Sequence, residues 1–226
     1  MKTEKRQADK QGENGECYML EIKEISKIIN NNTILEDIDL ELIPGKIYGI
    51  VGRNGSGKTM LFRIIAGLVK PTSGMILYKG ENVFEKSKNM PNIGITIENM
   101  GMYPEFSGFA NLRYLANIRK IASDEDIRNA IARVGLDSED KRPIKKYSLG
   151  MRQRIILAQA FMESPEILLL DEPTNGLDES GVELVRNILK EEAKRGAIVF
   201  LSSHNKEDIS YLCDEIYHIK SGRIEG

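Results

Sequence analysis

The segment GRNGSGKT, residues 52–59, decides the fold of this 226-residue chain. The short apolar run at 46–51 before it predicts a buried strand, and the apolar spacing at about 58–69 predicts a helix that ends near Lys70. The glycines allow the backbone to wrap closely around an anion, and loop N–H groups and the helix N-terminus present positive partial charge to it. The pattern GxxxxGK[ST] between a strand and a helix therefore predicts a phosphate-binding loop in an α/β fold.

The side chains of this loop predict a nucleoside triphosphate and Mg²⁺ as ligands. Lys58 should reach the β- and γ-phosphates, and the Thr59 hydroxyl should bind Mg²⁺. We expect these residues to contact the nucleotide: Gly52, Arg53, Asn54, Gly55, Ser56, Gly57, Lys58, Thr59 and Met60. The alternative, a glycine-rich turn with an unrelated lysine, is disfavoured by the strand and helix predicted on either side.

A second signal is the sequence ILLLDE at 167–172, in which two carboxylates follow four aliphatic residues. The aliphatic run predicts a buried strand, and ligands bind at the carboxyl ends of parallel strands. We expect Asp171 to hold Mg²⁺ through water and Glu172 to act as the general base on the attacking water. Alone, this segment would fit a strand that ends in two solvated acids. Together with the phosphate loop it predicts a P-loop nucleotidase, a description that kinases, GTPases and motor proteins share.

The order of the remaining predicted elements indicates a parallel α/β core interrupted by helices. Residues 1–16 contain no large apolar side chain after Met1, so we expect a disordered extension before one domain at 17–226. Helices fill an insertion at about 99–164, in which Ser123 and Ser148 are expected as N-caps. The predicted strands are 18–28, 33–43, 75–79, 93–98, 166–170, 197–202 and 214–219, and the predicted helices are 108–119, 124–134, 149–163, 179–195 and 205–212.

Composition excludes several other classes of protein. The formal net charge of -2, from 32 basic and 34 acidic residues, gives no reason to expect nucleic-acid binding. The two cysteines, Cys17 and Cys213, lack the spacing of a disulfide or metal pair, so we expect reduced thiols. The longest apolar runs are of strand length, far short of the ~20 residues that cross a bilayer. We therefore expect that the chain does not enter a membrane by itself.

The segment YSLGMRQR at 147–154 resembles the signature of the ABC ATPase family, which runs LSGGQ and continues with a basic, glutamine-containing stretch. Ser148 and Gly150 match that signature, whereas Leu149 and Met151 replace its first glycine and its glutamine. This variant is similar to subunits of drug, bacitracin and lantibiotic resistance exporters. The resemblance implies that a short segment binds the γ-phosphate of ATP held by a second subunit, in a head-to-tail dimer. That segment comprises Tyr147, Ser148, Leu149, Gly150 and Met151.

The resemblance covers about residues 18–226 and implies four further roles. Residues 175–178 resemble the family's D-loop, with Asp178 as its aspartate, and His204 matches the family's switch histidine, which contacts the γ-phosphate. Glu98 stands where the family usually has a glutamine that binds Mg²⁺ or its waters, although Glu98 could also be simply exposed. Ile29 stands in place of the aromatic residue on which the family stacks adenine, and an aliphatic side chain provides less stacking.

The resemblance implies a RecA-like P-loop core with an N-terminal antiparallel β subdomain and an inserted helical subdomain. It implies an ATP- and Mg²⁺-dependent ATPase subunit at the cytoplasmic face of the membrane, with a separate polytopic membrane subunit. The exporter-like signature favours transport of a peptide antibiotic, bacteriocin or drug. The alternative is a soluble ABC ATPase without a transporter. One such branch needs two ATPase domains, and another needs a long coiled coil between Thr59 and Ser148; the chain has room for neither.

Overall fold

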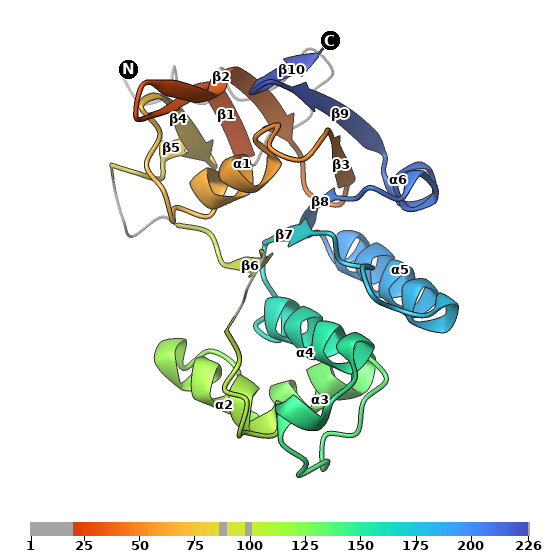
Figure 1. Cartoon of the computed structure of the whole chain (residues 1–226). Helices are drawn as coiled ribbons and strands as arrows, with labels where there is room; N and C mark the ends of the chain where they lie inside the picture. The colour runs from red at the N-terminus through yellow and green to blue at the C-terminus, as the bar shows by residue number, and fades with distance from the viewer. Residues whose placement is uncertain (1–19, 86–89, 98–100, 226) are drawn as a thin grey trace.

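The computed structural model describes residues 20–85, 90–97 and 101–225 (Figure 1). Four sequence predictions lie outside these residues: the disordered extension at 1–16, the reduced thiol of Cys17, the start of the first strand at 18, and Glu98. Within them, a six-stranded and a four-stranded sheet are present, together with the helices of an insertion. The predicted combination of a parallel core, an antiparallel region and inserted helices is therefore confirmed.

The six-stranded sheet has the order β10-β9-β3-β8-β7-β6, and all its neighbouring strands are parallel except β10 and β9. Its strands are β3 (Ile47–Val51), β6 (Ile93–Thr96), β7 (Ile167–Asp171), β8 (Ile198–Ser202), β9 (Glu215–Lys220) and β10 (Arg223–Glu225). All residues of β8 are buried, and so are the first four of β7. Continuous apolar runs of this kind are typical of a parallel sheet that is covered on both faces.

The four-stranded sheet is antiparallel and has the order β2-β1-β4-β5. Its strands are β1 (Leu20–Ile29), β2 (Asn32–Leu42), β4 (Ser73–Tyr78) and β5 (Glu81–Asn82). Asn30 and Asn31 join β1 to β2 with φ angles of 48° and 62°, the left-handed pair that a two-residue hairpin turn requires. The sequence did not predict β5, because two residues are too few to show alternation.

Helix α1 (Lys58–Ile65) packs between the two sheets, where its apolar side chains join one core cluster with β1, β2 and β3 (Figure 1). The predicted end of this helix near residue 69 is wrong. Gly67 has a φ of 72°, its N–H donates to Ile64 O, and the N–H of Leu68 donates to Arg63 O. This is a Schellman motif, which ends the helix at Ile65.

The inserted helices lie between β6 and β7, and in Figure 1 they form the lower part of the molecule. They are α2 (Gly108–Arg119), α3 (Asp124–Arg133), a short 3₁₀ helix (Ile144–Lys146) that was not predicted, and α4 (Leu149–Phe161). Ser123 caps α3 in a capping box with Asp126, and Ser148 caps α4, so both predicted N-caps are confirmed. Of the described helices, none has the length and apolar character that crossing a membrane requires.

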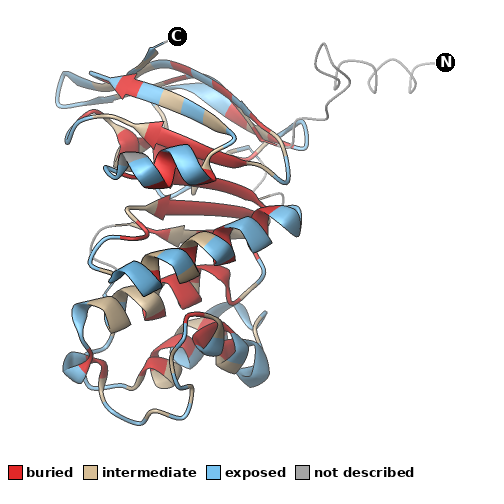
Figure 2. Cartoon of the chain, turned by 90° about the vertical axis from the view of Figure 1, so that its right-hand side faces the viewer, coloured by how far each residue is buried: buried red, intermediate tan, exposed pale blue. Residues whose placement is uncertain are grey.

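The core lies on both sides of the six-stranded sheet (Figure 2). Alternate residues of β7 and β8 point to opposite faces: Leu169 and Phe200 face α1, whereas Leu168 and Leu201 face α4 and α5 (Glu179–Lys194). Helix α6 (Lys206–Leu212) follows β8 and packs against α5. Nearby, burial raises the pKa of Cys213 to about 12, so this free thiol stays protonated at neutral pH.

Candidate functional site

Three of the predicted parts of the site lie at the carboxyl ends of three neighbouring strands. The phosphate loop follows β3, the acidic pair ends β7, and His204 follows β8. The register fixes their proximity, because Ser202 at the end of β8 pairs with Ile50 of β3 on one side and with Asp171 of β7 on the other. In parallel sheets this edge is where ligands bind.

The phosphate loop has a left-handed backbone, which favours glycine, at two positions. Gly55 and Gly57 have φ angles of 76° and 114°, and a Cβ on Gly57 would lie 2.6 Å from Leu35 of β2. Gly57 also precedes α1 without a side-chain cap, so the first N–H groups of that helix remain available to a ligand. The buried Ser56 hydroxyl has no hydrogen-bond partner among the described residues. These features fit a loop whose free N–H and O–H donors bind phosphate oxygens.

Lys58 lies within the curve of this loop and is 7% exposed. Its Nζ donates hydrogen bonds of 2.6 and 3.1 Å to the carbonyl oxygens of Gly52 and Arg53. These two carbonyl oxygens thus hold the ammonium group within the curve of the loop. Arg53, Asn54 and Gly55 are exposed, and a cavity of about 500 Å³ borders residues 51–56 and 218–221.

Thr59 and Asp171 come together beside the loop. The Thr59 hydroxyl donates to one carboxylate oxygen of Asp171 at 2.8 Å, and the Ser202 hydroxyl donates to the other. Hydroxyl and carboxylate oxygens are the ligands that Mg²⁺ prefers, so the donor set fits the predicted metal. Sequence reasoning missed Ser202, because its role depends on the pairing of β8 with β7.

Glu172 and His204 face each other across the ends of β7 and β8. The His204 backbone N–H donates to Glu172 Oε2 at 3.1 Å, and His204 Nε2 lies 3.4 Å from Glu172 Oε1. Glu172 Oε1 is buried and accepts no hydrogen bond from the described residues. Glu172 also has a φ of 50°. This left-handed conformation costs a non-glycine residue about 1–3 kcal/mol and is found most often at functional sites. A carboxylate oxygen that accepts no hydrogen bond from the described residues, with His204 beside it, fits a proton acceptor.

The signature segment lies at the start of α4. The Ser148 hydroxyl accepts the Met151 N–H at 3.1 Å, and Leu149 is exposed at the first turn. Gly150 lies against the D-loop, since a Cβ there would be 3.3 Å from Gly176 O. Tyr147 is buried, and burial raises the pKa of its hydroxyl. A ligand would therefore meet the backbone of Tyr147 and not its ring.

Helix α4 also contacts the segment that carries the acidic pair. Gln153 Nε2 lies 3.5 and 3.4 Å from the carbonyl oxygens of Glu172 and Pro173, and Arg154 pairs with Asp178 at 3.1 Å. Asp178 caps α5, and the hydrogen bond from the Gly181 N–H, followed by that from Ser180 and by the Arg154 charge, holds the pKa of Asp178 below its usual range. The structure thus brings the signature helix and the D-loop together within one chain.

Two further residues predicted to contact the nucleotide, Ile29 and Met60, lie outside the groups described above. Ile29 is partly exposed at the end of β1, beside the hairpin into β2, and Met60 is half-buried against the core.

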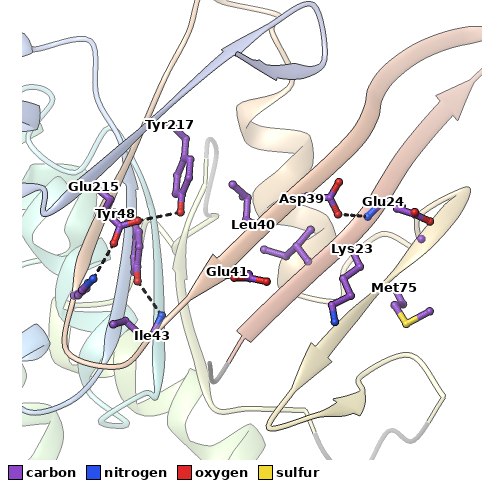
Figure 3. Close-up of a pocket in the computed structure, with 13 residues that line it drawn as sticks. Lys23, Glu24, Asp39, Leu40, Glu41, Ile43, Tyr48, Met75, Glu215 and Tyr217 are labelled. Atoms are coloured by element: carbon purple, nitrogen blue, oxygen red, sulfur yellow. Dashed lines mark hydrogen bonds and ion pairs between the residues drawn. The ribbon is translucent and has the colours of Figure 1, made fainter. Parts of the chain in front are cut away.

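A separate pocket of about 660 Å³, shown in Figure 3, lies between the four-stranded sheet and strands β3 and β9. Some of its polar groups bind one another, as in the 2.9 Å ion pair of Lys46 with Glu215 and the 2.8 Å hydrogen bond from the Ile43 N–H to the Tyr48 hydroxyl. No predicted site residue lines it.

Comparisons with known proteins agree with this site. The family described as ABC transporter matches residues 35–175. The uncharacterized ABC transporter ATP-binding protein YybJ of Bacillus subtilis is 47% identical, over 92% of this chain and 95% of its own. The lantibiotic transport ATP-binding protein SrtF of Streptococcus pyogenes is 35% identical, over 91% of this chain and 89% of its own. The bacitracin transport ATP-binding protein BcrA of Bacillus licheniformis is 37% identical, over 91% and 68%.

A solved structure described as the ATP-binding subunit of an ABC transporter has the same fold. Its TM-score is 0.83 at 24% identity, over 92% of this chain and 88% of that one. The family match covers both the phosphate loop and the acidic pair, so the resemblance that the signature segment indicated is confirmed. None of these comparisons favours the soluble alternative. The chain belongs to the ABC transporter family, as an ATP-binding and ATP-hydrolysing subunit.

Proposed function

We propose that this chain powers export of a peptide antibiotic, bacteriocin or similar amphiphile through a separate membrane subunit, and that it works as a head-to-tail dimer at the cytoplasmic face of the membrane. One observation carries the role of ATP-driven motor: the phosphate loop, the Thr59–Asp171 pair and the Glu172–His204 pair meet at one edge of the sheet. The names of two relatives, which refer to lantibiotic and bacitracin transport, support the class of substrate.

The loop N–H groups and Lys58 would hold the triphosphate, and Thr59 and Asp171 would hold Mg²⁺, Asp171 through water. Bound Mg²⁺ would supply positive charge beside the β- and γ-phosphates. Glu172 Oε1 would accept the proton of the attacking water, and His204 beside it would contact the γ-phosphate. Ser148 and the N-terminus of α4 in a second copy would cover the same phosphate from the other side.

An exposed aromatic cluster on the helical insertion supports a membrane partner. The ring of Tyr103 lies 5.3 Å from that of Phe106 and 5.0 Å from that of Tyr114, and all three side chains are exposed, as is Ile118. Exposed apolar groups gathered in this way mark interaction sites more often than they mark inert surface. We infer that helices of the membrane subunit dock here, where closure of the dimer would move them.

Purification of the tagged chain from membranes of its native host tests the proposed function. We expect a polytopic membrane protein to co-purify and purified chain to hydrolyse ATP. Recovery of the chain without any membrane protein, in the presence of ATP, of ADP and of neither, would contradict the transporter. Absence of ATP hydrolysis by folded chain, with or without that partner, would contradict the motor role.

We expect Ser148→Arg to leave ATP binding by the monomer intact and to block ATP-dependent dimerisation. The arginine side chain would occupy the space that the partner's γ-phosphate needs. Size-exclusion chromatography of the Glu172→Gln and Glu172→Gln/Ser148→Arg variants with ATP measures this. Ser123→Arg is the matched control, because it removes the N-cap of α3 at a similar cost of about 1 kcal/mol without facing the nucleotide. Loss of ATP binding by the Ser148→Arg monomer would show that the signature acts on its own chain's nucleotide.

We expect weak selection of the base, with ATP and GTP affinities within about tenfold, or about 1.4 kcal/mol. Phosphate contacts cannot distinguish these nucleotides, and Ile29 offers no aromatic platform. Ile29→Tyr should tighten ATP binding by about 1 kcal/mol, whereas Ile28→Tyr, on the opposite face of β1, should not. Competition titration measures both effects. A hundredfold preference of the wild type for ATP would mean that another residue recognises adenine.

A further inference from the structure

Asp208 is a buried carboxylate whose two oxygens bind different parts of the site's framework. It lies on α6, four residues after His204, and is 1% exposed. Its Oδ2 accepts a 2.6 Å hydrogen bond from the hydroxyl of Thr174, which is itself buried. Its Oδ1 accepts the Arg186 Nε–H at 2.8 Å, and Arg186 belongs to α5. One side chain thus connects three segments that are distant in sequence.

The partners of Asp208 flank the catalytic groups. Thr174 lies two residues after Glu172, in a turn where the Asn175 N–H donates to Glu172 O at 3.1 Å and the Leu177 N–H donates to Thr174 O at 3.2 Å. The same turn leads to Asp178, the N-cap of α5. On the other side, Asn205 caps α6 directly after His204. Asp208 therefore binds the Glu172 turn to the helix that begins beside His204.

The ladder between β7 and β8 ends at Asp171 and Ser202, after which the Glu172 N–H donates to Ser202 O at 3.1 Å and the His204 N–H donates to Glu172 Oε2 at 3.1 Å. Beyond these residues the chain leaves the sheet, and the 3.4 Å approach of His204 Nε2 to Glu172 Oε1 depends on how the two segments are held. The Thr174–Asp208 hydrogen bond is a buried side-chain contact that spans them. Its loss would remove one of the contacts that hold α6 in place relative to the Glu172 turn, beside the His204 N–H to Glu172 hydrogen bond.

We propose that Asp208 is a positioning residue for ATP hydrolysis, which holds His204 in register with Glu172 through its hydrogen bond to Thr174. The inference rests on the proposed roles of Glu172 and His204. Asp208 itself contacts neither, and its partners in the structure are Thr174 and Arg186. A displacement of the D-loop would be transmitted to His204 through the same contact, because the Glu172 turn continues into Asp178.

Thr174→Val and Thr174→Ser are the variants that test this role, since both leave the Asp208–Arg186 ion pair in place. Valine has the shape of threonine without the hydroxyl, whereas serine keeps the hydroxyl. In full-length chain we expect Thr174→Val to lower kcat for ATP hydrolysis about 10-fold, because displacements of about 1 Å at a reacting centre cost up to 10²-fold. KM for ATP should change less than twofold, and Thr174→Ser should keep kcat within twofold of wild type.

Two further measurements distinguish positioning from a general loss of stability. In a His204→Ala background, Thr174→Val should change kcat less than twofold, because residues that act as a unit are not additive. Glu192→Gln is the matched control: Glu192 is 3% exposed at its side chain and pairs with Arg133 and Arg195, away from the site. It should lower the thermal midpoint of unfolding and leave kcat within twofold.

Equal kcat for Thr174→Val and Thr174→Ser would overturn the inference. A full 10-fold effect of Thr174→Val in the His204→Ala background would also overturn it, since the contact would then act without His204. If either result is obtained and the wild-type chain hydrolyses ATP, this inference is contradicted and the proposed function is not. A folded wild-type chain that does not hydrolyse ATP contradicts the proposed function and this inference together.

Discussion

Replacing Glu172 with glutamine is expected to leave ATP binding intact and to slow hydrolysis by about 10²- to 10⁴-fold, the usual contribution of a general base. Glutamine keeps the shape of the side chain and an acceptor for the His204 N–H, but it cannot take a proton from water. In the structure, Glu172 Oε1 accepts no hydrogen bond from the described residues, so its lone pairs remain available to a proton. Single-turnover measurement of phosphate release gives the rate, and ATP titration gives the affinity.

The same substitution should allow the ATP-bound dimer to accumulate, because hydrolysis is the step that reopens it. Size-exclusion chromatography with ATP and Mg²⁺ would show the dimer for Glu172→Gln and mostly monomer for wild type. Glu183→Gln is a matched control, since Glu183 is an exposed carboxylate on α5. Wild-type turnover by Glu172→Gln would remove Glu172 from the catalytic role.

The phosphate loop and the acidic pair could be predicted from the sequence because both signals are local. A buried strand is followed at once by a glycine-rich loop in one case and by two carboxylates in the other. The carboxyl ends of parallel strands meet at one edge, so their proximity follows from the fold class alone. The positions of Ser148 and Ser123 at helix starts were predictable for the same reason, since capping depends on the next three residues.

The contacts of Ser202 and Asp208 could not be predicted, because they depend on strand register and helix packing. Ser202 reaches Asp171 only because β8 pairs with β7 in the observed register. Asp208 would have been taken for an exposed acid near the start of a helix, yet the packing of α6 against α5 buries it. The end of α1 was different: Gly67 was a readable stop signal, and the prediction of a longer helix overlooked it.

The contacts of α4 suggest how the two nucleotides of a dimer would be linked. Its N-terminus would cover the partner's γ-phosphate, whereas Gln153 and Arg154 of the same helix contact Pro173 O and Asp178 of its own chain. A rigid helix of 13 residues therefore lies between one site's signature and the other site's general base. In the proposed dimer, a displacement of α4 by one nucleotide would therefore also move the residues around Glu172 at the second nucleotide.

Lys58→Ala is expected to act earlier than Glu172→Gln, by abolishing tight binding of ATP. The substitution removes the charge that faces the phosphates, and charge-assisted hydrogen bonds contribute about 1.5–3 kcal/mol each, or roughly 10- to 100-fold in affinity. It also removes the donor that the Gly52 and Arg53 carbonyl oxygens share, so the loop loses the internal bonds that hold its curve. Both effects act in the same direction, and we expect ATP affinity to fall at least 100-fold.

A titration series separates the phosphate contribution from a general defect. ATP and ADP should both bind more weakly to Lys58→Ala, whereas adenosine, which has no phosphate, should bind as it does to wild type. Lys194→Ala is the control for a lost surface charge, since Lys194 is exposed in the last turn of α5. Unchanged ATP affinity of a folded Lys58→Ala chain would contradict the assignment of residues 52–59 as the phosphate-binding loop. A fall in adenosine binding equal to that of ATP would mean instead that the substitution deforms the whole nucleotide site, and that Lys58 acts through the loop's shape and not through its own charge.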